Sequence, residues 1–108
     1  MNSITFEEFK KVEIRIGKII NVEKVENADK LLKLQVDFGS FQRQIVSAVA
    51  ESFTLEDLVG KKLPFIVNLE YRKFKKEESQ GMLMAIDADE KTVLLEPMED
   101  VKEGTLVV

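Results

Sequence analysis

A cluster of cationic side chains between residues 72 and 76 is the part of this sequence most suited to binding chemistry: Arg72, Lys73, Lys75 and Lys76. The segment then closes on Ser79, Gln80 and Gly81, which provide two neutral hydrogen-bonding side chains and one residue without a side chain. Point charges, neutral donors and close backbone approach are what a polar groove needs to hold a phosphate chain and one or two bases. The segment therefore has the parts of a nucleic-acid-binding loop.

The same segment is also compatible with a solvated loop that keeps a strand edge from aggregating. Three nearby glutamates, Glu70, Glu77 and Glu78, reduce its net charge to about +1, the quantity that matters for counterion release. Tyr71 and Phe74 could stack on bases, a contact worth about 1–3 kcal/mol each, or pack the loop onto the fold. Local composition leaves these interpretations open.

Other residues are candidates for contacting a ligand, but each also has an ordinary structural explanation. Lys30 could bind phosphate or be a turn lysine, and Asn27 could contact a ligand or form an Asx turn. Arg43 could contact phosphate or a base, or face outward toward an acidic neighbour. Asn68 could read a base or bond to the backbone, and Met82 is a core candidate that lies near the loop.

Composition limits the remaining chemistry. The 108 residues, expected to form one domain over 1–108, include no cysteine and no histidine. This removes thiolate nucleophiles, zinc–thiolate sites and the usual general base near neutral pH. The acidic residues at 87, 89 and 90 lack the ligand number and glycine of a calcium loop. We therefore expect no enzyme, no cofactor and no metal.

The net charge of −4 counts against nonspecific nucleic-acid binding but permits a basic patch on one side. No apolar run approaches the length of a membrane span, and the first residues lack a secretory pattern. A cytoplasmic protein without membrane contact is the expectation.

The elements that would position these residues are mostly strands. A capping box at Thr5 and Glu8 predicts a short helix, whose apolar side should plug one end of the core. Alternating apolar residues from Val12 to Ile16 predict a strand, in which Gly17 marks a bulge or bend. Further strands are predicted over residues 32–38, 41–47, 63–69 and 82–86, with a helix near 54–60 and a final hairpin turn near 87–91.

This order, three strands, a helix and further strands, is that of the OB-fold, a five-stranded barrel. The prediction is an all-β OB-fold with a short N-terminal helix, a helix between strands 3 and 4, and a C-terminal β extension. Another small barrel, such as an SH3-like one, has a compatible periodicity. In the OB-fold, Asn27 and Lys30 lie in the loop joining strands 1 and 2, and the cationic segment lies between strands 4 and 5. Both loops should then meet at the side of the barrel where this fold binds ligands.

With these residues established, nearly the whole chain resembles a known family. It is similar to free-standing tRNA-binding proteins, the C-terminal domain of many bacterial methionyl-tRNA synthetases and the endothelial monocyte-activating polypeptide domain. The motifs that carry the resemblance lie at residues 12–18, 27–31, 43–47, 58–62 and 68–82. The chain departs from the family pattern at Ala48, at Glu70-Tyr71 and at Lys76.

The resemblance implies structure-specific tRNA binding and a homodimer formed through the ends of the fold, acting alone or with methionyl-tRNA synthetase. It implies tRNA contacts at Asn27, Lys30, Arg43, Asn68, Arg72, Lys73, Ser79 and Met82; Lys75, Lys76 and Gln80 join them from the loop chemistry. The alternative from another functional class is a protein-interaction or chaperone-like module of the same fold, motivated by the acidic net charge.

Overall fold

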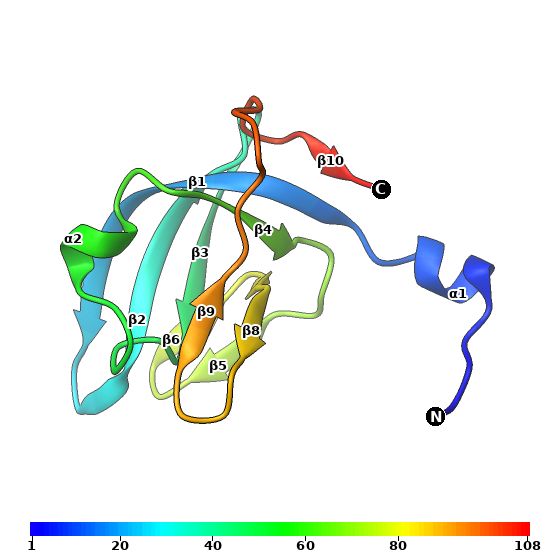
Figure 1. The fold of residues 1–108 in the computed structure, drawn as a ribbon. Helices are drawn as coiled ribbons and strands as arrows, with labels where there is room; N and C mark the ends of the chain where they lie inside the picture. Colours follow the sequence, from blue (N-terminus) through cyan, green and yellow to red (C-terminus); the bar gives the residue numbers. More distant parts are fainter.

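A curved antiparallel sheet is the centre of the structure, a computed structural model that describes residues 1–108. Its strands are β1 (Ile14–Val25), β2 (Ala28–Asp37), β3 (Gln42–Ser47), β4 (Lys62–Ile66), β7 (Met82–Leu83) and β10 (Leu106–Val107). They are ordered β3-β2-β1-β4-β7, with β10 paired to the start of β1 (Figure 1). Because β1 is long and curved, its first half pairs with β4 and its second half with β2.

The apolar side chains of the strands point into one core. Along β2 the alternation expected from the sequence is observed, with Leu32, Leu34 and Val36 buried and the lysine and glutamine between them partly exposed. Phe38 and Phe65 meet edge to face at 5.6 Å between ring centroids inside this core. The two-residue period of the sequence thus determines which face of the sheet is buried.

Gly17 has a different role from the predicted one. The register shifts in β1 lie between Ile19 and Asn21 and between Lys24 and Val25, not at the glycine, so the predicted position of the bulge is wrong. Gly17 is instead buried, and an added Cβ would collide with Val36 Cγ1 and lie 2.6 Å from Phe38 Cε1. Packing against these two side chains requires a residue without a side chain at this position.

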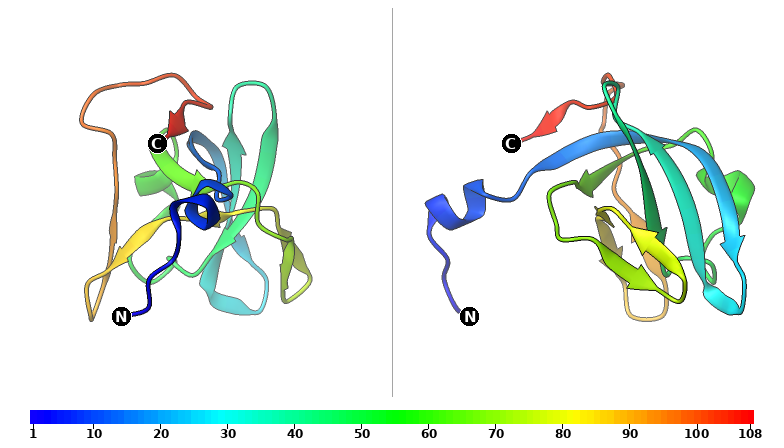
Figure 2. Two further views of the ribbon diagram at one scale, coloured as in Figure 1. Left: turned by 90° about the vertical axis from the view of Figure 1, so that its right-hand side faces the viewer. Right: turned by 180° about the vertical axis from the view of Figure 1, so that it is seen from behind.

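Both predicted helices are present, and each begins with a capping box. In α2 (Leu55–Leu58), Thr54 and Asp57 bond reciprocally, and Leu58 is fully buried. In α1 (Phe6–Lys10), Thr5 and Glu8 do the same, but no residue of the helix is buried. The prediction that this helix plugs the core is wrong, because α1 stands away from the barrel (Figures 1 and 2).

The segment between β4 and β7 also differs from the prediction. It contains a hairpin, β5 (Arg72–Phe74) and β6 (Glu77–Ser79), where a charged loop was expected. The predicted strand 82–86 is divided, since β7 ends at Leu83 and β8 (Ala85–Asp87) leaves the sheet to pair with β9 (Thr92–Leu94). The β8–β9 hairpin confirms the predicted turn near 87–91.

The predicted fold class is confirmed: the chain is an all-β, OB-like fold with the expected order of helices and a C-terminal β extension. The strand ladder does not close into a ring, however, because no strand pairing joins β3 to β7. Neither helix is long and apolar enough to span a membrane.

Candidate nucleic-acid interface

Two turns that are far apart in the sequence line one groove on the surface. The β1–β2 turn contributes Glu26 and Asn27, and the β5–β6 turn contributes Lys75 and Lys76. The groove has a volume of about 650 Å³ and is completed by Lys24, Val25, Lys33 and Glu77. The prediction that the two polar segments meet is confirmed for Asn27 with Lys75 and Lys76. It is wrong for Lys30, which was expected in the same loop but lies on β2, outside the groove. Four lysines against two glutamates make this groove electropositive, although the whole chain is acidic.

Backbone conformation holds each turn tightly. Asn27 has φ +61° and Lys75 has φ +59°, both in the left-handed region. Asparagine tolerates this region well, whereas for a lysine it is uncommon. The tip of the hairpin therefore presents its lysines in a sharply turned backbone, close to the β1–β2 turn.

Lys33 anchors the hairpin to the barrel. Its Nζ lies 3.1 Å from Glu77 on β6 and 3.3 Å from Glu23 on β1. These bonds, first that to Glu77 and then that to Glu23, raise the pKa of Lys33 above its ordinary value. The charge of this lysine is already neutralised within the protein, so it positions the groove and is less available to a polyanion.

The four cations of the β5–β6 hairpin differ from Lys33, because no carboxylate neutralises their charge. Arg72, Lys73, Lys75 and Lys76 are all exposed, and none belongs to an ion pair of the structure. Arg72 lies over the ring of Phe74 at 5.0 Å, which packs that ring and orients the guanidinium. Lys30 on β2 is likewise exposed and unpaired, but it lies outside the groove. These side chains can bind phosphate without first breaking an internal ion pair.

Three of the candidate residues join β3 to the β6–β7 segment in place of the missing strand pairing. Ser79 is 3% exposed; its Oγ accepts from the Val46 amide at 2.9 Å and donates to the Gly81 carbonyl at 2.8 Å. The Gln80 amide donates to the Gln44 carbonyl at 2.8 Å, and the Gln80 side chain accepts from the Gln44 amide at 3.0 Å. We call this junction the seam.

Arg43 is the third member of the seam. Its Nη1 donates to the carbonyl of Val67 at 3.1 Å and to that of Gln80 at 2.9 Å. Its guanidinium also faces the rings of Phe41 and Tyr71, at 4.9 Å and 5.7 Å from their centroids. Arg43 is therefore held in place by the fold and does not face an acidic neighbour.

Asn68 and Met82 lie at the two ends of the same segment. Asn68 Oδ1 accepts from the Glu13 amide at 2.8 Å, and its Nδ2 donates to the Lys11 carbonyl at 2.6 Å. The amide thereby fixes the connection between α1 and β1. Met82 is 41% exposed, outside the core, while its neighbour Leu83 is buried. Of the sequence candidates, Asn27, Lys30, Met82 and the hairpin cations are accessible; Arg43, Asn68, Ser79 and Gln80 have structural partners.

Sequence reasoning missed Lys24 and Lys33 as residues of the groove. Lys24 is three residues before Asn27, so its closeness to the turn was a usable signal. Lys33 faces Glu23 across the β1–β2 ladder, a pairing that depends on strand register. Its second partner, Glu77, is 44 residues away and required the folded structure.

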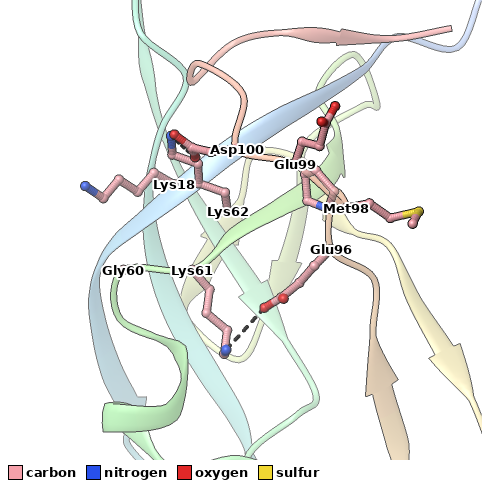
Figure 3. Close-up of a pocket in the computed structure, with 9 residues that line it drawn as sticks. Lys18, Gly60, Lys61, Lys62, Glu96, Met98, Glu99 and Asp100 are labelled. Carbon is pink, nitrogen blue, oxygen red and sulfur yellow. Dashed lines mark hydrogen bonds and ion pairs between the residues drawn. The ribbon is translucent and has the colours of Figure 1, made fainter.

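A second cluster of charges fastens the C-terminal segment to β4 and is not a candidate for binding a polyanion (Figure 3). Lys62 Nζ lies 2.8 Å from Asp100 and 3.2 Å from Glu103, and Lys61 lies 3.2 Å from Glu96. Asp100, followed by Glu103, raises the pKa of Lys62, and Lys62 in turn lowers the pKa of Asp100. These cations are already matched by carboxylates.

The family model described as "Putative tRNA binding domain" matches residues 14–106, which include both turns and the seam. The chain belongs to this tRNA-binding domain family. The resemblance inferred from the sequence motifs is thereby confirmed. The chain is also 47% identical over 104 residues to the methionine–tRNA ligase of Archaeoglobus fulgidus, in an alignment that covers 96% of this chain but 16% of that ligase. It therefore spans a small part of the length of such relatives.

Solved structures agree with this assignment. A MetRS-related protein from Pyrococcus horikoshii is 38% identical and matches this chain over the whole of both chains, with a TM-score of 0.94. The chaperone CsaA from Bacillus anthracis is 23% identical and has a TM-score of 0.89, covering 99% of this chain and all of that one. The second similarity shows a shared fold.

Proposed function

We propose that the chain is a noncatalytic module, formed by residues 1–108, that recognises the shape of tRNA rather than its base sequence. The observation that carries the proposal is the groove between the β1–β2 turn and the Lys75–Lys76 turn, beside cations that have no acidic partner. Phosphate contacts position a nucleic acid and carry no sequence information directly. A lysine-lined groove therefore favours recognition of the path of the RNA backbone.

The proposed contact surface consists of accessible residues of three kinds. Lys24, Asn27, Lys75 and Lys76 line the groove, Arg72 and Lys73 belong to the same hairpin, and Lys30 and Met82 are exposed outside the groove. Arg43, Asn68, Ser79 and Gln80 support that surface by holding the seam and the α1–β1 connection. In this proposal the module works in the cytoplasm. It presents tRNA to a methionyl-tRNA synthetase, either as a part of that enzyme's chain or as a separate partner.

Salt dependence of tRNA binding tests the proposal. Each phosphate contact contributes about −0.7 to −0.9 to the slope of log affinity against log salt. Replacing both turn lysines, Lys75→Gln with Lys76→Gln, should weaken binding and make the slope shallower by about 1.5. Filter binding of bulk tRNA at several salt concentrations measures both quantities.

A charge-matched control is Lys91→Gln with Lys102→Gln. Both lysines are exposed, neither lines the groove, and neither is in an ion pair. This variant has the same net charge as the turn variant and should retain the slope of the unmodified protein. Equal losses in the two variants would show that net charge, and not the groove, controls binding. An affinity of the unmodified protein that is indifferent to salt would end the proposal.

We also propose that the module is a homodimer formed through α1 and the C-terminal strand. Helix α1 has only five residues and leaves Phe6 and Phe9 exposed, and Ile4 and Val12 are exposed on either side of it. Isolated helices shorter than about 12 residues are marginal in water, so α1 needs a surface to pack against. Leu106 on β10 is also exposed, and α1 and β10 lie toward the same end of the molecule (Figure 1).

Light scattering tests the dimer. The unmodified chain should have twice the monomer mass at micromolar concentration, and Phe6→Ser with Phe9→Ser should reduce it to the monomer mass. Val59→Ser, an exposed apolar residue after α2, is the control and should leave the dimer intact. A monomeric unmodified chain would contradict the proposal.

A protein-interaction or chaperone-like role is the second candidate, favoured by the exposed apolar residues of α1. Isolation of the tagged chain from lysate separates the two. RNA of tRNA size that co-purifies favours the first proposal, whereas protein partners that survive nuclease treatment favour the second.

A further inference from the structure

Tyr71 lies directly before β5 and is 48% exposed. Its ring faces the guanidinium of Arg43, which is also in contact with the ring of Phe41, so that the cation lies between two aromatic rings. Such an arrangement stabilises an aromatic ring electrostatically through its face. Tyr71 is therefore supported from the side of the barrel while much of its surface remains open to solvent.

The support behind Tyr71 is rigid. Arg43 donates to two backbone carbonyls, those of Val67 and Gln80, at the seam. Because these carbonyls belong to the segments on both sides of the hairpin, the guanidinium cannot turn away without breaking the seam. An aromatic ring that is already held in place loses little conformational freedom when a ligand packs on it.

The other aromatic residue of the hairpin, Phe74, is not available in the same way. It is half-buried, and Arg72 lies over its ring at 5.0 Å. Of the two rings that the sequence offered for stacking, the structure leaves Tyr71 open and covers Phe74. This difference was not visible in the sequence, where both rings flank the same cations.

We propose that Tyr71 is a stacking platform for one unpaired base of the bound RNA. This inference rests on the proposed function and deepens it. An exposed aromatic ring beside a cationic strand is how proteins bind single-stranded segments without reading their sequence. From Tyr71 to Lys75 the chain advances four residues, about 13 Å at strand spacing. One RNA segment can therefore place a base on Tyr71 and phosphates along Arg72, Lys73 and the turn.

The chain offers a site-specific probe, since Tyr71 is its one tyrosine and it has no tryptophan. Full-length protein labelled with 3-fluorotyrosine gives a single fluorine resonance, which a stacked base shifts through its ring current. Bulk tRNA is titrated into one sample of the labelled protein. Inorganic polyphosphate, a polyanion that has no bases, is titrated into another. The resonance should shift with tRNA and change little with polyphosphate, although both compete for the lysines.

Binding measurements complete the test. Tyr71→Ala should weaken tRNA binding by about 5- to 150-fold and polyphosphate binding by much less. Tyr71→Phe retains the ring and should therefore keep most of the tRNA affinity. Equal losses for tRNA and polyphosphate, or a fluorine resonance that ignores tRNA while salt-dependent binding persists, would overturn the stacking proposal and leave the proposed function intact. If the unmodified protein shows no salt-dependent tRNA binding, the proposed function fails, and the stacking proposal fails with it.

Discussion

The substitution Ser79→Ala tests whether the seam is held by side chains. The Ser79 hydroxyl is the partner of the Val46 amide at 2.9 Å and of the Gly81 carbonyl at 2.8 Å, in a site that is 3% exposed. Alanine fits the space but cannot bond to either group. The Val46 amide would then be left in the interior without its partner, on the edge of β3 that is not paired with β2.

The expected cost follows from this geometry. Leaving a buried backbone group unsatisfied costs about 1–3 kcal/mol, and we expect the free energy of unfolding to fall by about 2 kcal/mol. For a domain of roughly this size, about 1 kcal/mol corresponds to a change of about 4–8 °C in Tm. Ser79→Ala should therefore lower Tm by about 8–16 °C.

Thermal and urea unfolding measure this loss, with Ser40→Ala as the control because Ser40 is exposed in the β2–β3 turn. The control should stay within about 0.5 kcal/mol of the unmodified protein. Affinity for tRNA is measured well below both Tm values and should change little in Ser79→Ala, because the hydroxyl faces the interior. A tenfold loss of affinity with an unchanged Tm would refute the reasoning and make Ser79 a contact with RNA.

Three further predictions concern other parts of the fold. Gly17→Ala would place a methyl group against Val36 and Phe38 and should destabilise the protein by about 1–3 kcal/mol; urea unfolding with an unchanged midpoint would contradict it. Asn68→Ala removes the bonds to Lys11 and Glu13 and should accelerate amide hydrogen exchange at Glu13 with little effect on the core; equal exchange rates would show that the α1–β1 connection is held by something else. The third prediction concerns acid. Lys62 lowers the pKa of Asp100 below its ordinary value. The pKa of Glu103 is also lowered, first by its own backbone amide and then by Lys62. Their stabilisation is complete above those ordinary values and is lost as the pH falls through the lowered ones, so the C-terminal segment should loosen below about pH 4. NMR shifts at Val101, whose carbonyl accepts from Lys62, measure this. Lys62→Gln should reduce the acid transition and leave the part that comes from the backbone hydrogen bond of Glu103.

Much of the fold followed from local patterns. The alternation in β2, the capping boxes at Thr5 and Thr54 and the turn near residue 89 are local features, and all are present in the structure. The failures also have a common cause. The close packing around Gly17 and the exposure of α1 both depend on which residues from elsewhere in the chain pack against them. The periodicity of the sequence does not report these contacts.

For the candidate site, the sequence by itself determined the residue types and the order of the elements, and hence which two turns should meet. Backbone geometry explains this, because period, caps and turns depend on near neighbours. Only the tertiary structure decided how each polar group is used: Lys33 bonds to Glu77 across 44 residues, Asn68 to Lys11 across 57, and Ser79 to Val46 across 33. A buried or seam-forming polar group must find a partner wherever the barrel brings one. The cations of the β5–β6 hairpin, by contrast, have no acidic partner.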